Sequence, residues 1–110
     1  MNNLQLNDQM IEEAGRIFSA LSDPSRLKLL RLLMASRKPM SQGALAEITG
    51  LSQANTSKHL GFLVQTGLVV REREGNMAYF RLVGPLVSDV CGLVKGHVLY
   101  RTQNAYQSLR

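Results

Sequence analysis

A short turn, Thr49-Gly50-Leu51-Ser52, separates two runs of residues that carry helical patterns. Before the turn, Ser41 can cap a helix over residues 42–49, and after it Ser52 can cap a helix over residues 53–66. Gly50 suits the left-handed conformation that is favoured just after a helix end. Leu51 supplies the apolar side chain that plugs the turn. The pattern therefore predicts two short helices joined as a helix-turn-helix.

The second helix of this unit carries polar side chains on its outer side, while Thr56, Leu60, Leu63 and Val64 form the predicted inner stripe. Gln and Asn can bond an adenine edge through two hydrogen bonds, Ser and Thr can donate or accept, and Lys and His can approach guanine or phosphate. An ordinary solvated helix face is the alternative. The predicted DNA contacts of this segment are Ser52, Gln53, Asn55, Thr56, Ser57, Lys58 and His59.

After Gly67 the pattern changes to two β-rich runs, residues 68–73 and 77–82, which predict a β-hairpin. Gly75 and Asn76 both tolerate the positive φ that tight hairpin turns require. Arg71 and Arg73 fall on one face by two-residue alternation. Arg71, Arg73, Asn76 and Arg81 are predicted to contact the DNA backbone or minor groove, and cross-strand ion pairs with neighbouring acids are the alternative for Arg71 and Arg73.

Three further helices are predicted around this unit, over residues 7–21, from residue 24 to about residue 35, and over residues 85–107. Asp23 and Pro24 mark the start of the second of these helices. Its leucines lie nearly all round, including Leu27, which predicts a central core helix. In the helix over residues 42–49, Ala44, Leu45 and Ile48 are predicted to face inward. The fold class is therefore mainly α with a small β-hairpin, a winged helix-turn-helix with five or six helices.

Composition narrows the possible functions. The chain has 110 residues, enough for one domain over 1–110, and its net charge of +5 suits a polyanionic partner without establishing one. The sequence has neither an apolar run long enough for a membrane span nor a signal-peptide pattern, and its single cysteine agrees with a reducing, cytoplasmic location. No acid and base pair, phosphate-binding glycine loop or metal cluster is visible, so we expect neither an enzyme nor a cofactor.

The chain resembles the ArsR/SmtB family of small bacterial winged-helix repressors over roughly residues 14 to 83. Four fragments carry the resemblance in combination, although each alone is weak. They are ALSDPSRL at 20–27, SQ at 52–53 with SKHL at 57–60, GLV at 67–69, and REGN at 73–76 with YFRL at 79–82. The resemblance implies a homodimer that binds an inverted repeat in double-stranded promoter DNA and blocks transcription.

In that family the dimer is built from the first and last helices, here about 7–21 and 85–107. Both helices carry an apolar stripe that has no obvious partner within so small a domain. This independently calls for a second copy of the chain. The predicted dimer interface comprises Ile11, Ala14, Phe18, Leu86, Val90, Leu93, Val94 and His97.

Family members usually release DNA when a metal or another inducer binds. The resemblance places Ser41, Gly43 and Ala44 at the positions of the family's Cys-x-Cys-Asp site, so that site lacks its thiolates. In the last helix, Asp89 and Cys91 match half of the other site, while Thr102 and Ala105 replace its second half. The sequence therefore predicts no metal site. Asp89 and Cys91 could act as ligands together with His97, but two or three scattered ligands rarely make a closed tetrahedral zinc site.

Cys91 is a possible redox or electrophile switch, and a buried cysteine acting as a small apolar side chain is the other interpretation. His97 on its apolar stripe is interpreted as a packed residue rather than a ligand. A winged helix that binds another protein, an activator and an anti-repressor that displaces another DNA-binding factor remain alternatives. The operator and the inducer are not specified by the sequence.

Overall fold

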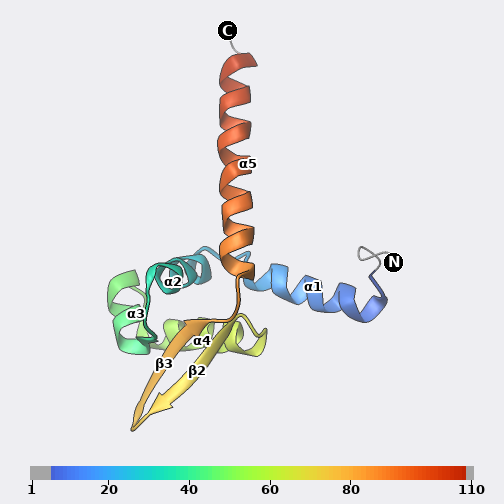
Figure 1. The fold of residues 1–110 in the computed structure, drawn as a ribbon. Helices are drawn as coiled ribbons and strands as arrows, with labels where there is room; N and C mark the ends of the chain where they lie inside the picture. The colour runs from blue at the N-terminus through green and yellow to red at the C-terminus, as the bar shows by residue number, and fades with distance from the viewer. Residues whose placement is uncertain (1–5, 109–110) are drawn as a thin grey trace.

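The computed structural model describes residues 6–108, apart from the side chains of residues 106–108. The elements follow the order α1 (Asp8–Ala20), α2 (Pro24–Ala35), β1 (Met40–Ser41), α3 (Gln42–Thr49), α4 (Gln53–Gln65), β2 (Val69–Glu74), β3 (Met77–Leu82) and α5 (Leu86–Ser108). Figure 1 shows a head made of α2, α3, α4 and the strands, from which α1 and α5 extend as two arms. The predicted winged helix-turn-helix is confirmed, with five helices in the described part of the chain.

The apolar core lies inside the head, between its helices and one face of the sheet. Burying each Leu, Val or Phe side chain contributes about 1.5–3 kcal/mol. Because α4 and both strands of the hairpin contribute to the same cluster, the core holds them together as one unit. The buried side chains of this cluster are Ala20, Leu29, Leu30, Leu33, Leu45, Leu60, Leu63, Leu68, Val69, Phe80 and Val87.

Two predictions about inward-facing residues were wrong. Ile48 is 61% exposed and Leu27 is 38% exposed. At about 100° per residue, Ile48 lies on the far side of α3 from the buried Ala46. The nearly all-round apolar pattern of α2 cannot be buried completely, because the head covers mainly the side of α2 that carries Leu29, Leu30 and Leu33.

Local capping interactions set the starts of the helices, as predicted. The Oγ atoms of Ser41 and Ser52 accept hydrogen bonds from the backbone N–H groups three residues on, at 3.2 and 3.0 Å, respectively. Gly50 ends α3 in the left-handed conformation, with φ +77°, and its N–H donates to the Ala46 carbonyl at 2.9 Å. A side chain at this position would be strained, so Gly50 fixes the turn between α3 and α4.

The sheet has three antiparallel strands in the order β1-β3-β2. Strand β1 was not predicted, since two residues are too few to show an alternating pattern. Met40 pairs with Phe80 and Ser41 pairs with Tyr79, so the segment before α3 is joined to the inner edge of the hairpin. This pairing ties the wing to the helix-turn-helix.

The hairpin itself is confirmed, with Val69 opposite Leu82 and Glu74 opposite Met77. Gly75 has a φ of +64°. Among the described residues only glycines adopt positive φ, so Asn76 does not. The expectation that Asn76 also takes positive φ was therefore wrong. A glycine with positive φ at the first of the two turn positions is the pattern of a type II′ turn, which needs it there alone.

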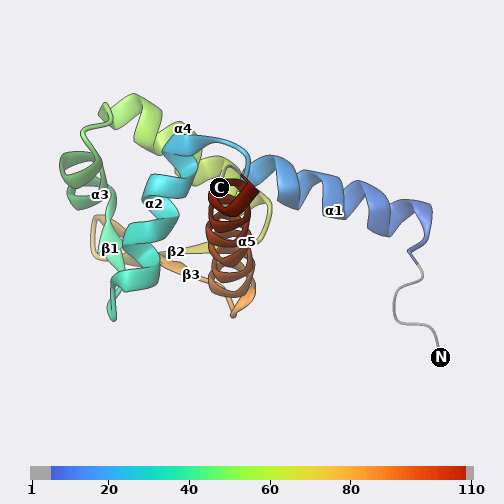
Figure 2. The ribbon, with the colours of Figure 1, turned by 90° about the horizontal axis from the view of Figure 1, so that it is seen from above.

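The two arms are anchored in the head only at their near ends. Ala20, the last residue of α1, and Val87, near the start of α5, are buried. Farther out, Phe18 is 65% exposed and Leu93 is 75% exposed. Figure 2, viewed down α5, shows α1 pointing away from the rest of the chain.

None of the described helices is long and apolar enough to cross a membrane. The single domain predicted over 1–110 stays a prediction, because residues 1–5 and 109–110 lie outside the described part.

We expect replacement of Asp23, the cap of α2, to destabilise the protein in a pH-dependent way. The backbone N–H of Arg26 donates to the Asp23 carboxylate at 3.2 Å, and this hydrogen bond lowers the pKa of Asp23 below its ordinary value. Burial raises the same pKa, by a smaller amount. A carboxyl group whose pKa falls on folding stabilises the folded state above its unfolded pKa of about 4, and loses that contribution as pH falls through the folded value. Asp23→Ala should therefore melt below wild type at pH 7.

Thermal melts followed by circular dichroism between neutral and acidic pH would measure this. The gap between Asp23→Ala and wild type should close as the pH falls below about 4. Glu47→Ala, which removes an exposed carboxylate from α3, is the control and should show no such closing gap. A gap that stays constant down to acid pH would contradict the assigned role of the charge.

Candidate nucleic-acid interface

Helix α4 presents the polar face that the sequence predicted. Gln53, Asn55, Ser57 and Lys58 are exposed along its outer side, while Leu60 is buried on the inner side. An exposed row of amide, hydroxyl and ammonium groups on a short helix can hydrogen-bond base edges and phosphates. The head holds this helix by its apolar side, so the polar groups project from a rigid support.

Thr56 does not belong to this face. Its side chain is fully buried, and its hydroxyl donates to the Ser52 carbonyl at 2.8 Å. The sequence prediction counted Thr56 both in the inner stripe and among the DNA contacts, and only the first of these fits the structure. Burial therefore removes Thr56 from the candidate contacts. Ser52 remains exposed, although its Oγ is engaged by the Asn55 N–H.

His59 is half-buried at the edge of the face, and its Nδ1 lies 3.3 Å from Nη1 of Arg26 in α2. A guanidinium can only donate hydrogen bonds, so a hydrogen bond between these two atoms would have Nδ1 as its acceptor. Arg26 was not among the predicted site residues. Its position 33 residues before His59 leaves no local signal of the contact.

A second residue that the sequence reading missed is Gln42, at the start of α3. Its Nε2 donates to Oε1 of Gln53 at 3.4 Å, across the turn of the helix-turn-helix. With Oε1 engaged in this way, the Gln53 amide group keeps its two N–H donors for an outside acceptor. The signal that could have found Gln42 is its place at the first position of α3, directly across the turn from Gln53.

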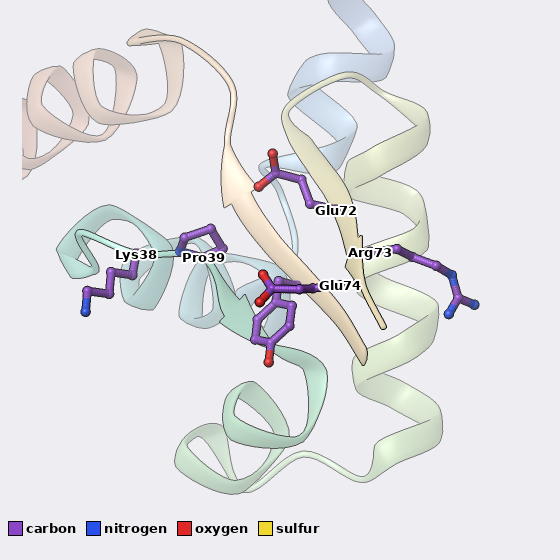
Figure 3. A pocket seen from close by; sticks show the side chains of 6 residues that line it. Lys38, Pro39, Glu72, Arg73 and Glu74 are labelled. Atoms are coloured by element: carbon purple, nitrogen blue, oxygen red, sulfur yellow. The ribbon is translucent and has the colours of Figure 1, made fainter. Parts of the chain in front are cut away.

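The wing separates its charges between the two faces of the hairpin. Residues directly opposite each other in a β-hairpin share a face, and Arg71 pairs with Phe80 while Arg73 pairs with Ala78. Phe80 is buried in the core against α4, so both arginines lie on the face of the wing that continues toward the recognition side. Figure 3 shows Arg73 on the side of α4. The predicted common face of Arg71 and Arg73 is confirmed.

Arg81 lies on the opposite face of the hairpin, together with the acidic residues. Its Nε donates to Oε1 of Glu72 at 3.1 Å. Among the described residues, the cross-strand ion pair that the sequence left open thus forms at Arg81 and not at Arg71 or Arg73. The guanidinium of Arg71 instead lies 5.4 Å from the ring centre of Phe80. These contacts favour Arg71 and Arg73 over Arg81 as phosphate contacts.

The far side of the wing borders a hollow of about 460 Å³, lined by Lys38, Pro39, Glu72, Arg73, Glu74 and Tyr79 (Figure 3). The side chains of Glu72 and Glu74 lie on the opposite side of the hairpin from the side chain of Arg73. Lys38 and Arg73 also line the hollow, and Glu72 is paired with Arg81, so the charges around it are mixed. The hollow therefore borders the face of the hairpin that carries Glu72, Glu74 and Arg81, while the side chain of Arg73 lies on the other face.

Of the other predicted site residues, Asn76 lies at the turn of the hairpin, Ile11, Ala14 and Phe18 lie on α1, and the rest lie on α5. Cys91 is half-buried and borders an apolar hollow of about 280 Å³, lined by Leu21, Leu27, Val90, Cys91, Val94 and Lys95. Within residues 6–108, no group of three or more His, Cys, Asp and Glu side chains comes close enough to hold a metal ion. His97 is exposed, so its interpretation as a packed residue does not hold within one chain. These residues form no site with α4.

A polar recognition helix beside an arginine-bearing wing, both supported by one core, defines a winged helix-turn-helix DNA-binding protein. Residues 21–72 match a helix-turn-helix domain family. The chain is 34% identical over 75 residues to the transcriptional repressor SdpR of Bacillus subtilis, a match that covers 68% of this chain and 81% of SdpR.

Two further relatives agree. A probable mercury resistance operon repressor of Streptomyces lividans is 33% identical over 84 residues, covering 76% of this chain and 66% of that protein. The chain is also similar to a solution structure from Mycobacterium bovis, with a TM-score of 0.77 and 27% sequence identity. The match covers 94% of this chain and 95% of that chain. That structure is described as a homodimeric winged helix-turn-helix DNA-binding domain of a possible ArsR-family transcriptional regulator. The chain belongs to the ArsR/SmtB family of DNA-binding transcriptional regulators, which are not enzymes.

The sorting of charge on the wing predicts different roles for two arginines of the same hairpin. Each phosphate contact adds about 0.9 to the slope of log K against log salt concentration. We expect Arg73→Ala to reduce the slope by about that amount. Arg81→Ala, the matched control on the opposite face, should leave the slope unchanged. Fluorescence anisotropy with labelled promoter DNA at several salt concentrations measures both, and equal changes for the two variants would contradict the assignment.

Proposed function

We propose that this protein is a cytoplasmic, dimeric repressor that binds an inverted-repeat operator and leaves it in response to a signal. The observation that carries the proposal is the combination of the polar face of α4 with apolar side chains exposed along α1 and α5 of the same chain. One feature reads DNA and the other requires a second copy. A two-fold pair of such chains matches the symmetry of an inverted repeat.

The dimer part of the proposal rests on exposed apolar side chains. Met10, Ile11 and Phe18 on α1, and Leu93 and Val94 on α5, are each about half exposed or more. Proteins in water rarely expose so many large apolar side chains together, and helices in proteins gain most of their stability from the packing of their apolar face. We assign the predicted interface residues to contacts between α1 and α5 of one protomer and those of its partner.

The hollow beside Cys91 extends this proposed interface toward the head. It is lined mainly by apolar side chains of α5 and of the segment from Leu21 to Leu27, next to the exposed stripe of α5. An apolar stripe such as that of α1 fits a hollow of this kind. In the dimer, Ala14, Leu86, Val90 and His97 would then be covered together with the more exposed residues.

The DNA contacts follow from the two faces already described. Gln53, Asn55 and Ser57 are proposed to reach base edges in the major groove, and Lys58 to reach base or phosphate. At the edges of the face, Ser52 and His59 would contact the backbone. Arg71, Arg73 and Asn76 of the wing are proposed to lie along phosphates or in the minor groove. Half-sites would be about one DNA turn, roughly 34 Å, apart.

The release signal is the open part of the proposal. Asp89 and Cys91 supply only half of the family's last-helix metal site, and Thr102 and Ala105 supply no usual ligand for the rest. A thiol-responsive regulator that acts through Cys91 is the second candidate, since Cys91 borders the hollow between α2 and α5 and its oxidation would disturb apolar packing there.

The proposal is tested with the purified, reduced, metal-free protein and DNA from its own promoter. Binding of two chains to an inverted repeat, falling steeply with salt, is the expected result. Binding is then repeated after addition of zinc or a mild thiol oxidant, with Cys91→Ser as the control for oxidation. Salt-insensitive or absent binding would favour a protein-interaction module, and in vitro transcription distinguishes repression from activation or anti-repression.

If Gln53 reads a base, Gln53→Ala should relax the preference at one operator position. The expected loss of discrimination there is about 1–3 kcal/mol, while binding to other positions keeps its preferences. Binding to a library of operators with single base changes measures this. Gln65→Ala, which changes an exposed glutamine at the opposite end of α4, is the matched control. Equal weakening by Gln53→Ala on every sequence would contradict base reading.

If α1 belongs to the dimer interface, Phe18→Asp should yield a monomer, because a carboxylate would be buried in an apolar contact. Its DNA affinity should fall together with dimerisation. Gln9→Asp places the same charge about half a turn round the same helix and is the control. Molar mass measured by light scattering after gel filtration distinguishes the two, and a dimeric, DNA-binding Phe18→Asp variant would remove α1 from the interface.

A further inference from the structure

Arg26, in the first turn of α2, contacts two other helices through a single guanidinium group. Its Nε donates to the carbonyl of Ala20 and its Nη2 donates to the carbonyl of Ser19, each at 2.8 Å, at the end of α1. Its Nη1 lies 3.3 Å from Nδ1 of His59 in α4. Its Cζ lies 4.6 Å from the ring centre of Phe62, also in α4. Three helices therefore meet at one side chain.

These contacts make use of every part of the guanidinium. The carbonyl groups at the end of a helix lack partners within it and carry partial negative charge, so a cation held against them is favourable. The planar face of the same group lies over an aromatic ring, which adds a cation–π interaction. The backbone N–H of Arg26 is held in turn by the Asp23 cap. The side chain is thus fixed at its base and at its head.

We propose that Arg26 is a positioning residue that sets the angle between the dimerisation helix α1 and the recognition helix α4. This inference rests on the proposed dimer. In such a dimer, the angle between α1 and α4 in each protomer determines how far apart the two recognition helices lie. Arg26 thereby determines which spacing of half-sites the protein accepts, without itself contacting a base.

The position of Arg26 supports this role over a purely stabilising one. Ala20 is the buried point where α1 enters the head, and Met10, Ile11 and Phe18 farther out on α1 stay exposed among the described residues. The recognition face of α4 begins at Gln53, six residues or nearly two turns before His59, the first residue of α4 that Arg26 contacts. A small rotation at this joint is therefore carried to the far end of α1 and to the dimer axis.

Arg26→Lys is the informative substitution, because it keeps the positive charge but not the planar fork. A lysine ammonium is a compact point charge that cannot reproduce two parallel carbonyl contacts and stack over a ring at the same time. Arg31→Lys is the matched control, since Arg31 lies farther along the same helix and is exposed. Both variants are first checked for folding by circular dichroism and for dimerisation by light scattering.

The main experiment compares binding to operators whose half-sites are separated by the natural distance or by one base pair more or less. Wild type and Arg31→Lys should discriminate against the altered spacings by about tenfold or more, as a rigid dimer requires. Arg26→Lys should lose most of that discrimination, while its affinity for an isolated half-site should fall by a much smaller factor, because His59 is one contact among several on the face of α4. A merely structural role would weaken all of these DNAs alike.

A second readout does not involve DNA. With Ser57→Cys spin-labelled on each protomer in a Cys91→Ser background, pulsed electron paramagnetic resonance reports the distance between the two recognition helices. The distribution should broaden when Arg26→Lys is added and remain unchanged with Arg31→Lys.

Unchanged spacing discrimination together with an unchanged distance distribution in a folded Arg26→Lys dimer would overturn the inference and leave the proposed function intact. Loss of binding to the half-site and to every operator in equal measure would also overturn it. If wild type itself fails to dimerise or to prefer an inverted repeat, the proposed function fails, and the role of Arg26 fails with it.

Discussion

The apolar core shared by α4 and the hairpin is the constraint on which the rest of the structure depends. Leu60 and Leu63 of α4 occupy the same buried cluster as Val69 and Phe80 of the wing. A recognition helix and a wing that share a core cannot move independently without exposing apolar surface. The recognition helix and the wing are therefore held as one preorganised unit, and α1 joins that unit at the buried Ala20.

The distribution of charge between the two faces of the wing explains how a weakly charged head can bind a polyanion. Between residues 52 and 81, four basic and two acidic residues leave a formal charge of only +2. Alternation along β2 places Arg71 and Arg73 on one face and Glu72 and Glu74 on the other. The face beside α4 is thus more positive than the net charge suggests. The position of the charges carries more information than their sum.

Features that depend on neighbouring residues could be predicted from the sequence, and those that depend on distant ones could not. The caps at Ser41 and Ser52 act within one helical turn, so the starts of α3 and α4 were predicted correctly. The two-residue strand β1 exists only because β3 lies beside it. Thr56 has the residue type of a DNA contact, but the helix turns it into the core. The contacts of Arg26 with His59 and Phe62 join segments far apart in the chain, and no periodicity reveals them.

The alternation along β2 has a consequence for how this chain can evolve. Because side chains in a strand change face at every residue, inserting or deleting one residue between Val69 and Arg71 would exchange the two faces of the strand beyond that point. The carboxylates would then turn toward α4 and the arginines toward the hollow at Pro39. Loop-length changes at the Gly75 tip leave the faces as they are. The reach of the wing can therefore change at the Gly75 tip without exchanging the faces, whereas a change in the length of β2 before Arg71 exchanges them unless it adds or removes an even number of residues.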